Sequence, residues 1–127
     1  MTSMPKPSDE TKELFRAVLP VDDRVHAKPM FGQLAGFVNG NMFSGVYGDS
    51  VFVRLGDEDR RALLREEGAC VFEPMAGRLM KDYVMLPGGW MQEPERVRQW
   101  IERALEASAA LPAKIPKPAR SKGKRLG

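Results

Sequence analysis

The segment "MFGQLAGFVNGNMFSGVYGD" (residues 30–49) constrains the fold more than any other part of the chain, because it spaces five glycines among apolar residues. Asn39-Gly40 is a strong signal for a two-residue hairpin turn, since both central residues of a type I′ turn need a positive φ. Gly48-Asp49 offers a second such turn a few residues later. The segment therefore predicts consecutive antiparallel strands joined by tight turns.

Two-residue turns at these positions also predict the register of the strands. The pairs expected on one face are Phe37 with Met42, Ala35 with Ser44, Val46 with Val51, Ser44 with Val53, and Met42 with Leu55. We expect this face, which is apolar apart from Ser44, to be the core face. On the opposite face Gly36 would lie beside Phe43 and Gly45 beside Phe52, so that each ring covers a strand glycine.

The same glycines could instead belong to a phosphate-binding loop, but their spacing argues against it. They stand at positions 32, 36, 40, 45 and 48, which matches neither the dinucleotide fingerprint nor the P-loop pattern. A phosphate loop also opens a helix, whereas these glycines lie between predicted strands. The glycines therefore form bends in a sheet.

Three helices are predicted from apolar spacing and end signals. Ser8 is the expected N-cap of the first helix, residues 58–67 form the second, and Pro94 begins the third. The apolar face of the third helix, which we expect to pack on the sheet with Trp100 buried, consists of Val97, Trp100, Ile101, Ala104, Leu105 and Ser108. Further strands are expected at 25–31, 70–74 and 79–86. The fold class predicted is a two-layer α+β domain, with an antiparallel sheet of five or six strands (a meander plus a hairpin) and flanking helices.

Basic residues are concentrated near the C-terminus. The basic side chains of residues 113–127 are Lys114, Lys117, Arg120, Lys122, Lys124 and Arg125, and this segment has no acidic residue. The rest of the chain carries fourteen Lys and Arg against seventeen Asp and Glu, a net charge of −3. We expect a flexible N-terminus at 1–7, a folded domain at 8–112 and a disordered basic tail at 113–127.

Catalytic and metal-binding patterns are missing from the sequence. His26 and Cys70 are each the only residue of their kind, too few for a zinc site of His and Cys ligands, and Cys70 reads as a small buried residue in an apolar strand. Ser44 does not lie in a nucleophile-elbow motif. We therefore expect no enzyme activity, no cofactor and no metal. One cysteine and the lack of a membrane-spanning stretch favour a cytoplasmic protein.

An ordered series of short motifs resembles the TfoX N-terminal domain family, named for the TfoX/Sxy regulators of bacterial competence. The matching pieces, between about Leu14 and Pro112, are Met30-Phe31-Gly32, Asn39-Gly40, Met42-Phe43, Leu55, Phe72 with Pro74, Gly77-Arg78, Met80, Tyr83-Val84, Pro87, and Trp100 with Ala104. The resemblance implies a two-layer α+β domain of bacterial type, without established catalytic residues or cofactor, and a link to transcriptional control for the longer members of the family. Longer members add a helical C-terminal domain, whereas Pro112 is followed here by the basic tail.

The first functional hypothesis is a regulatory or adaptor domain that binds a protein, either an unknown partner or a second copy of itself. The candidate surface is the second sheet face, with Phe43, Tyr47, Phe52 and Arg54, if no helix covers it. The alternative for the same aromatic residues is that they complete the core beneath a helix.

Two other hypotheses remain open from the sequence. The six basic residues of the tail could bind nucleic-acid phosphates without reading bases, or could merely keep the chain soluble. A small-molecule binder or enzyme could use the polar residues Arg54, Arg78, Lys81, Asp82 and Tyr83, although strand alternation spreads them over two faces.

Overall fold

The computed structural model describes residues 8–30, 33–75 and 77–112. Its elements are α1 (Asp9–Val18), β1 (Val25–Met30), β2 (Gln33–Val38), β3 (Asn41–Tyr47), β4 (Ser50–Arg54), α2 (Asp57–Leu64), β5 (Cys70–Met75), β6 (Arg78–Met85), the 3₁₀ helix η1 (Gly88–Gln92) and α3 (Pro94–Ala109). No helix in this part of the chain is long and apolar enough to cross a membrane.

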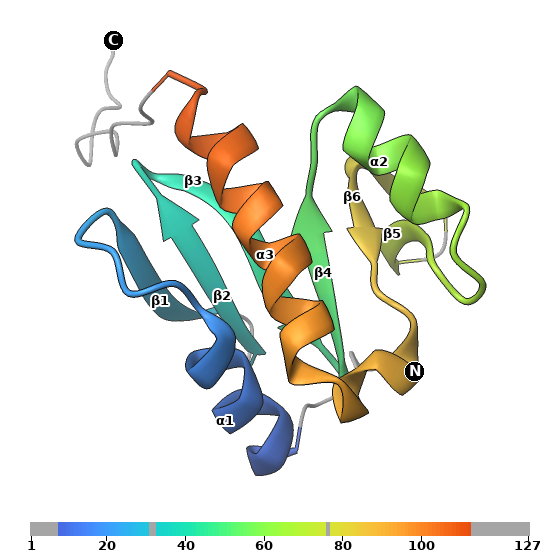
Figure 1. Cartoon of the computed structure of the whole chain (residues 1–127), viewed down its shortest axis with the longest axis horizontal. Helices are drawn as coiled ribbons and strands as arrows, with labels where there is room; N and C mark the ends of the chain where they lie inside the picture. Colours follow the sequence, from blue (N-terminus) through green and yellow to red (C-terminus); the bar gives the residue numbers. More distant parts are fainter. Residues whose placement is uncertain (1–7, 31–32, 76, 113–127) are drawn as a thin grey trace, which may run out of the picture.

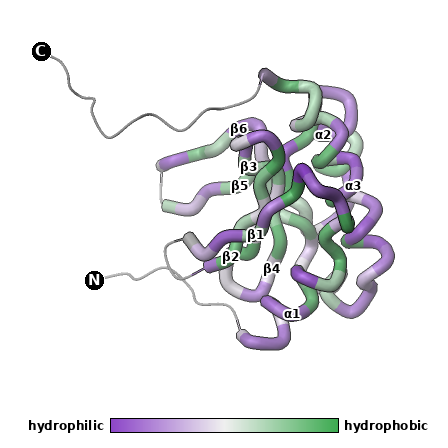
Figure 2. Tube along the Cα trace, turned by 90° about the vertical axis from the view of Figure 1, so that its left-hand side faces the viewer, coloured by the Kyte–Doolittle hydropathy of each residue, from purple (hydrophilic) through white to green (hydrophobic). Residues whose placement is uncertain are grey.

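The six strands form one antiparallel sheet in the order β1-β2-β3-β4-β6-β5. Strands β1 to β4 are a meander, and the β5–β6 hairpin joins it through β6, which pairs with β4. The helices lie on one side of the sheet, with α1 and α3 crossing the meander and α2 near β6 (Figures 1 and 2). The predicted two-layer α+β fold is confirmed.

Local signals account for the ends of α1. The Ser8 side chain accepts a hydrogen bond from the backbone N–H of Thr11, 3.2 Å away, as expected of an N-cap. The helix ends at Val18, before Pro20, and its buried residues are Thr11, Phe15 and Val18. A capped amphipathic helix thus packs on the sheet as the apolar spacing predicts.

The tryptophan buried in the core is not the one expected. Helix α3 begins at Pro94 and buries Val97, Ile101, Ala104, Leu105 and Ser108. Trp100 lies beside this stripe and is only half-buried, with the guanidinium of Arg103 4.8 Å from its ring centroid. Trp90, in η1, is 6% exposed and belongs to the core. The expectation of a buried Trp100 is wrong, because its position falls at the edge of the apolar face.

Two smaller expectations also differ from the structure. Helix α2 begins at Asp57, one residue before the predicted start, and ends at Leu64, earlier than the predicted end near residue 67. Cys70 is exposed on the edge strand β5, not buried. An edge strand has a neighbour on one side only, so an apolar residue in it is less covered than the local sequence suggests.

The two predicted hairpin turns are confirmed. Asn39 and Gly40 have φ values of 51° and 81°, and Gly48 has a φ of 60°. Pairing of Val38 with Asn41 and of Tyr47 with Ser50 leaves two residues in each turn. The meander is therefore set by residues that tolerate a left-handed backbone.

A bulge between β2 and β3 changes the predicted faces. Phe37 pairs with Met42 as expected, but Gly36 pairs with Ser44 and Ala35 with Gly45, which leaves Phe43 as an extra residue in β3. An extra residue of this kind shifts every later side chain to the other face.

The bulge brings Phe43 to the helix side and leaves Met42 on the other side. The predicted core face is therefore partly wrong. Met42 lies away from the helices, and so do Ala35 and Phe37 by strand alternation. The predicted Met42–Leu55 pair does not form, because Leu55 is in the helix-side core and its N–H is bonded to the carbonyl of Asp82. The pairs Ser44–Val53 and Val46–Val51 are confirmed, and they face the helices.

Candidate functional site

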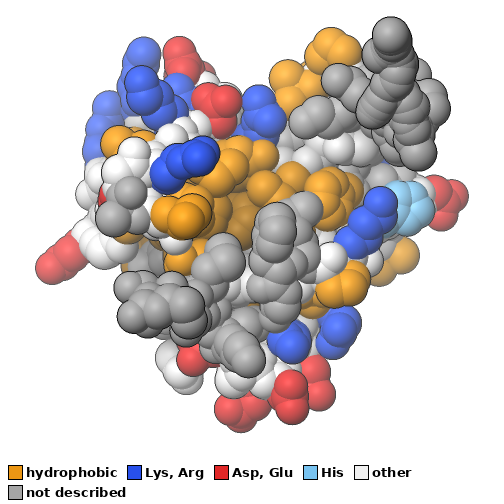
Figure 3. Space-filling model, turned by 180° about the vertical axis from the view of Figure 1, so that it is seen from behind, with side chains coloured by type: hydrophobic (Ala, Val, Ile, Leu, Met, Phe, Trp, Pro, Cys, Tyr) orange, Lys and Arg blue, Asp and Glu red, His pale blue; other side chains and the backbone are white. Residues whose placement is uncertain are grey.

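A second cluster of apolar side chains lies on the side of the sheet that no described helix covers. Its members, which define what we call the open face, are Met42, Tyr47, Phe52, Phe72, Met80, Tyr83 and Met85. Figure 3 views this side and shows hydrophobic side chains gathered in a hollow, with Lys and Arg side chains around it. The open face is the candidate functional site.

The aromatic rings of the open face are held against one another and against a glycine. The rings of Phe52 and Phe72 stack with centroids 4.3 Å apart and an interplanar angle of 11°. Tyr47 meets Phe72 edge-on at 5.2 Å, and Tyr83 meets Phe52 at 5.6 Å. Phe52 lies over Gly45, as predicted, because a Cβ at Gly45 would stand 2.5 Å from its ring.

Polar side-chain atoms on this face form hydrogen bonds within the protein. The Tyr47 hydroxyl donates to the carbonyl of Pro74 at 2.5 Å, and the Tyr83 hydroxyl donates to the carbonyl of Met42 at 2.9 Å. Gln33 accepts a hydrogen bond from the N–H of Gly48 at 3.1 Å through its side-chain oxygen. Burial raises the pKa of the Tyr83 hydroxyl, with the nearby Arg54 acting in the opposite direction. These bonds leave mainly carbon and sulfur facing the solvent.

A groove of about 340 Å³ runs over the open face between the meander and the β5–β6 hairpin. Its lining residues are Gln33, Leu34, Ala35, Met42, Val46, Tyr47, Phe52, Phe72, Pro74, Met75 and Met80. Met75, near the tip of the hairpin, is 61% exposed. The groove is thus apolar, open at the surface and rich in methionine, a side chain that adapts to different contacts.

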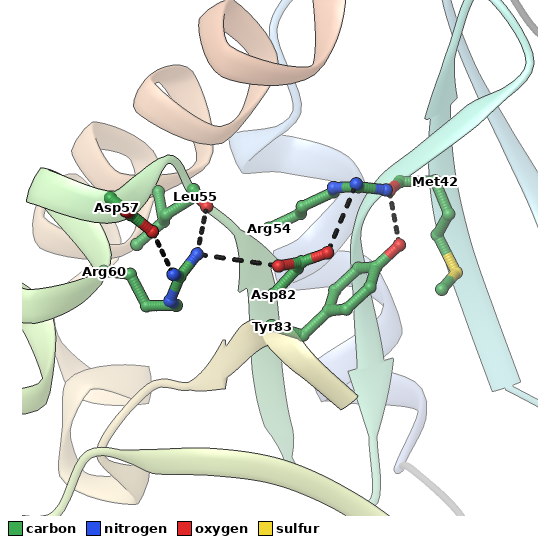
Figure 4. A network of polar contacts seen from close by, with 7 residues as sticks. All are labelled: Met42, Arg54, Leu55, Asp57, Arg60, Asp82 and Tyr83. Carbon is green, nitrogen blue, oxygen red and sulfur yellow. Dashed lines mark hydrogen bonds and ion pairs between the residues drawn. The ribbon is translucent and has the colours of Figure 1, made fainter. Parts of the chain in front are cut away.

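Beside the groove, a network of polar contacts joins β4, β6 and α2 (Figure 4). The carboxylate of Asp82 lies 3.4 Å from Arg54 and 3.7 Å from Arg60. Arg60 also donates to the carbonyl of Leu55 at 3.1 Å and contacts Asp57. The guanidinium of Arg54 lies 5.7 Å from the ring centroid of Tyr83. Arg54, Asp82 and Tyr83 therefore lie together, but each already interacts with residues of neighbouring strands or of α2.

The remaining candidates have separate positions. Tyr47, Phe52 and Arg54 lie on or beside the open face, whereas Phe43 is fully buried on the helix side. The expectation that Phe43 belongs to an interaction face is wrong, because the bulge in β3 turns it towards the helices. Its ring lies against Gly36, with 3.4 Å to a Cβ placed there, so this predicted ring-on-glycine contact forms on the opposite side.

The open face has members that sequence reasoning did not assign to it. Met42, Phe72, Met80 and Met85 face it, together with Tyr83. Phe72 and Met80 reach the meander only because β6 pairs with β4, although α2 and β5 separate these two strands in the sequence. The apolar run at the start of "CVFEPM" indicates a strand, but nothing in the local sequence says which strand it pairs with.

Other sequence candidates do not form a site among the described residues. His26 and Cys70 lie on β1 and β5, the two opposite edges of the sheet. The Ser44 hydroxyl is buried and donates to the carbonyl of Phe52 at 2.7 Å. Within the described ranges, no group of three or more His, Cys, Asp or Glu side chains could hold a metal. Outside the described residues lie the tail residues Lys114, Lys117, Arg120, Lys122, Lys124 and Arg125.

The fold and the open face together define the class: an α+β domain whose sheet is covered by described helices on one side only. The family model of the TfoX N-terminal domain matches residues 13–108. The chain belongs to this family, and the match supports a regulatory or competence-related domain. No curated protein matches the chain.

Proposed function

We propose that this protein is a non-enzymatic regulatory domain that acts by binding another protein on the open face. The observation that carries the proposal is the methionine-rich apolar groove, which stands open beside the stacked Phe52 and Phe72. Apolar patches with aromatic and methionine side chains are typical of protein-binding surfaces. Rings already held in place also lose little conformational freedom on binding.

The chemistry of the groove supports binding over catalysis. The hydroxyl groups of the open face are occupied, since Tyr47 and Tyr83 donate to backbone carbonyls. A general acid or base needs a titratable group within reach of the substrate. The family supports a regulatory role, and we place this role in transcriptional control in the bacterial cytoplasm, where a single cysteine fits a reducing compartment.

The test uses two exposed apolar residues of the β5–β6 hairpin as a matched pair. Met75 lines the groove, whereas Leu79 does not, and their side chains are 61% and 54% exposed. The wild-type protein and the variants Met75→Glu and Leu79→Glu are immobilised and incubated with an extract of the source cells, and captured proteins are quantified. Because both side chains are exposed, neither change should unfold the domain, which melting curves verify.

The proposal expects a protein that the wild type and Leu79→Glu capture and that Met75→Glu captures much less. Equal capture by all three proteins would place the binding surface elsewhere. Light scattering over a concentration series covers the case of a second copy, since self-association that Met75→Glu abolishes would make the partner this chain itself. A small apolar ligand that binds the groove while no protein does so would overturn protein binding.

A further inference from the structure

The charged side chains that strands β1 to β4 contribute to the open face are all positive. Strands β1 to β4 contain no Asp or Glu. Lys28 on β1 faces this side, because its ammonium lies 5.5 Å from the ring centroid of Phe37. Arg54 on β4 stands over the ring of Tyr83. On β6, strand alternation places Arg78 on the same face as the groove residue Met80. Three cationic side chains thus lie on or beside the open face.

The two carboxylates of the sheet strands are already engaged. Asp82 on β6 lies between Arg54 and Arg60. Glu73 on β5 accepts a hydrogen bond from the N–H of Gly77 at 2.7 Å. In the part of the chain that the structure describes, neither carboxylate pairs with Lys28 or Arg78. The other acidic side chains of residues 8–112 lie on helices and loops. The open face therefore presents apolar surface flanked by positive charge.

This charge pattern separates the candidate occupants. Two copies that met face to face would bring like charges together, which disfavours a symmetric dimer through the open face. An acidic partner would instead neutralise Lys28 and Arg78 while an apolar side chain entered the groove. The groove, at about 340 Å³, is small among ligand pockets, which span roughly 300–1,000 Å³. A few apolar side chains would fill it.

A partner bound on the open face would form a third layer against the sheet, and this position indicates its secondary structure. An uncovered apolar sheet face is normally packed by helices, as α1 and α3 pack the other side of this sheet (Figure 2). Nucleic acid fits the face less well, because bases need free ring faces and Phe52 and Phe72 are stacked on one another.

We propose that the open face binds an acidic amphipathic helix of another protein, with apolar side chains in the groove and carboxylates beside Lys28 and Arg78. This inference rests on the proposed function and adds the chemistry of the partner. The apolar side chains hold the helix by burial, and the carboxylates select it and orient it.

The experiment measures fluorescence anisotropy of labelled synthetic helical peptides with the full chain. One peptide has Leu on one side and Glu on the other, the second has Lys in place of Glu, and the third has Ser in place of Leu. The test variant is Lys28→Glu with Arg78→Glu. The control is Arg16→Glu with Arg65→Glu, which changes the net charge equally at two exposed positions on α1 and after α2.

Of the three peptides, the acidic Leu peptide should bind the wild-type protein most tightly, and its affinity should fall at high salt. Its affinity for the test variant should be lower than its affinity for the control variant by a factor of about ten or more. The inference is overturned if the Lys peptide binds as well, if the Ser peptide binds as well, or if both double variants bind alike. The same measurement is made with labelled duplex DNA. The inference is overturned if the wild-type protein binds the DNA and not the peptide, and if this DNA binding is lost in the test variant. The proposed function would still stand if captured proteins are lost with Met75→Glu but retained by the Lys28/Arg78 variant.

Discussion

Phe52 lies directly over Gly45, so closely that a Cβ at position 45 would stand 2.5 Å from one ring carbon and 2.8 Å from another. The backbone carbonyl of Leu34 would stand 3.2 Å from the same Cβ. The two residues are opposite each other on β3 and β4. This contact fixes the ring that stacks on Phe72, and so the floor of the groove.

Gly45→Ala should destabilise the domain by about 1–3 kcal/mol, the usual cost of overpacking. The added methyl group has to displace the Phe52 ring, so peptide binding at the open face should weaken as well. Denaturant unfolding measures the first effect and anisotropy the second. Gly89→Ala is the control, since a Cβ there meets nothing within 4 Å. Equal stability of the two variants would contradict the close contact.

The two tryptophans should differ in their contribution to stability. Trp90 is buried in the core with the guanidinium of Arg96 3.9 Å from its ring centroid, whereas Trp100 is half-buried. Trp90→Ala should cost about 3–5 kcal/mol, the range for large aromatic core residues, and Trp100→Ala clearly less. Chemical denaturation of both variants checks the order. A larger loss for Trp100→Ala would mean that α3 is rotated relative to the structure.

The pH dependence of stability should contain a contribution from Asp49. Its pKa is lowered from the ordinary value, first by the backbone N–H of Ser8 and then by the hydroxyl of Thr11, both 2.9 Å from the carboxylate. A pKa that is lower in the folded state stabilises the fold above the unfolded pKa, and this stability is lost as the pH falls through the folded value. The loss should therefore begin below about pH 4.

Asp49→Asn keeps an acceptor oxygen but cannot titrate, so its stability should fall less steeply than that of the wild type in this acid range. Thermal melts from neutral pH downwards measure the two curves. Identical slopes below pH 4 would show that the bonds from Ser8 and Thr11 do not favour the charged form.

The basic tail remains a separate prediction. Deletion of 113–127 should leave thermal stability nearly unchanged and retain the bond from Asn41 to the carbonyl of Pro112. If the tail binds duplex DNA, at most six phosphate contacts give a slope of log K against log salt no steeper than about −5. A salt titration of intact and truncated protein measures this. Binding that survives truncation, or that depends on DNA sequence, would place a nucleic-acid surface on the domain.

The local elements of this protein follow from its sequence. The turns at Asn39-Gly40 and Gly48-Asp49 form where predicted, because few residues other than Gly and Asn accept a positive φ. Ser8 and Pro94 mark the starts of their helices for equally local reasons, a side chain that caps and a ring that fits the first turn. The two-layer α+β class follows from these elements in order.

Tertiary structure decided which side chains face the helices. The extra residue Phe43 in β3 reverses the faces of part of the meander, and it is placed by packing against Gly36 and the helix-side core, which no local pattern encodes. The pairing of β6 with β4 brings Phe72 and Met80 to Phe52 from a distant part of the chain. Strand alternation predicts two faces but not which one is buried, because burial depends on where the helices pack. The open face is therefore a product of long-range packing.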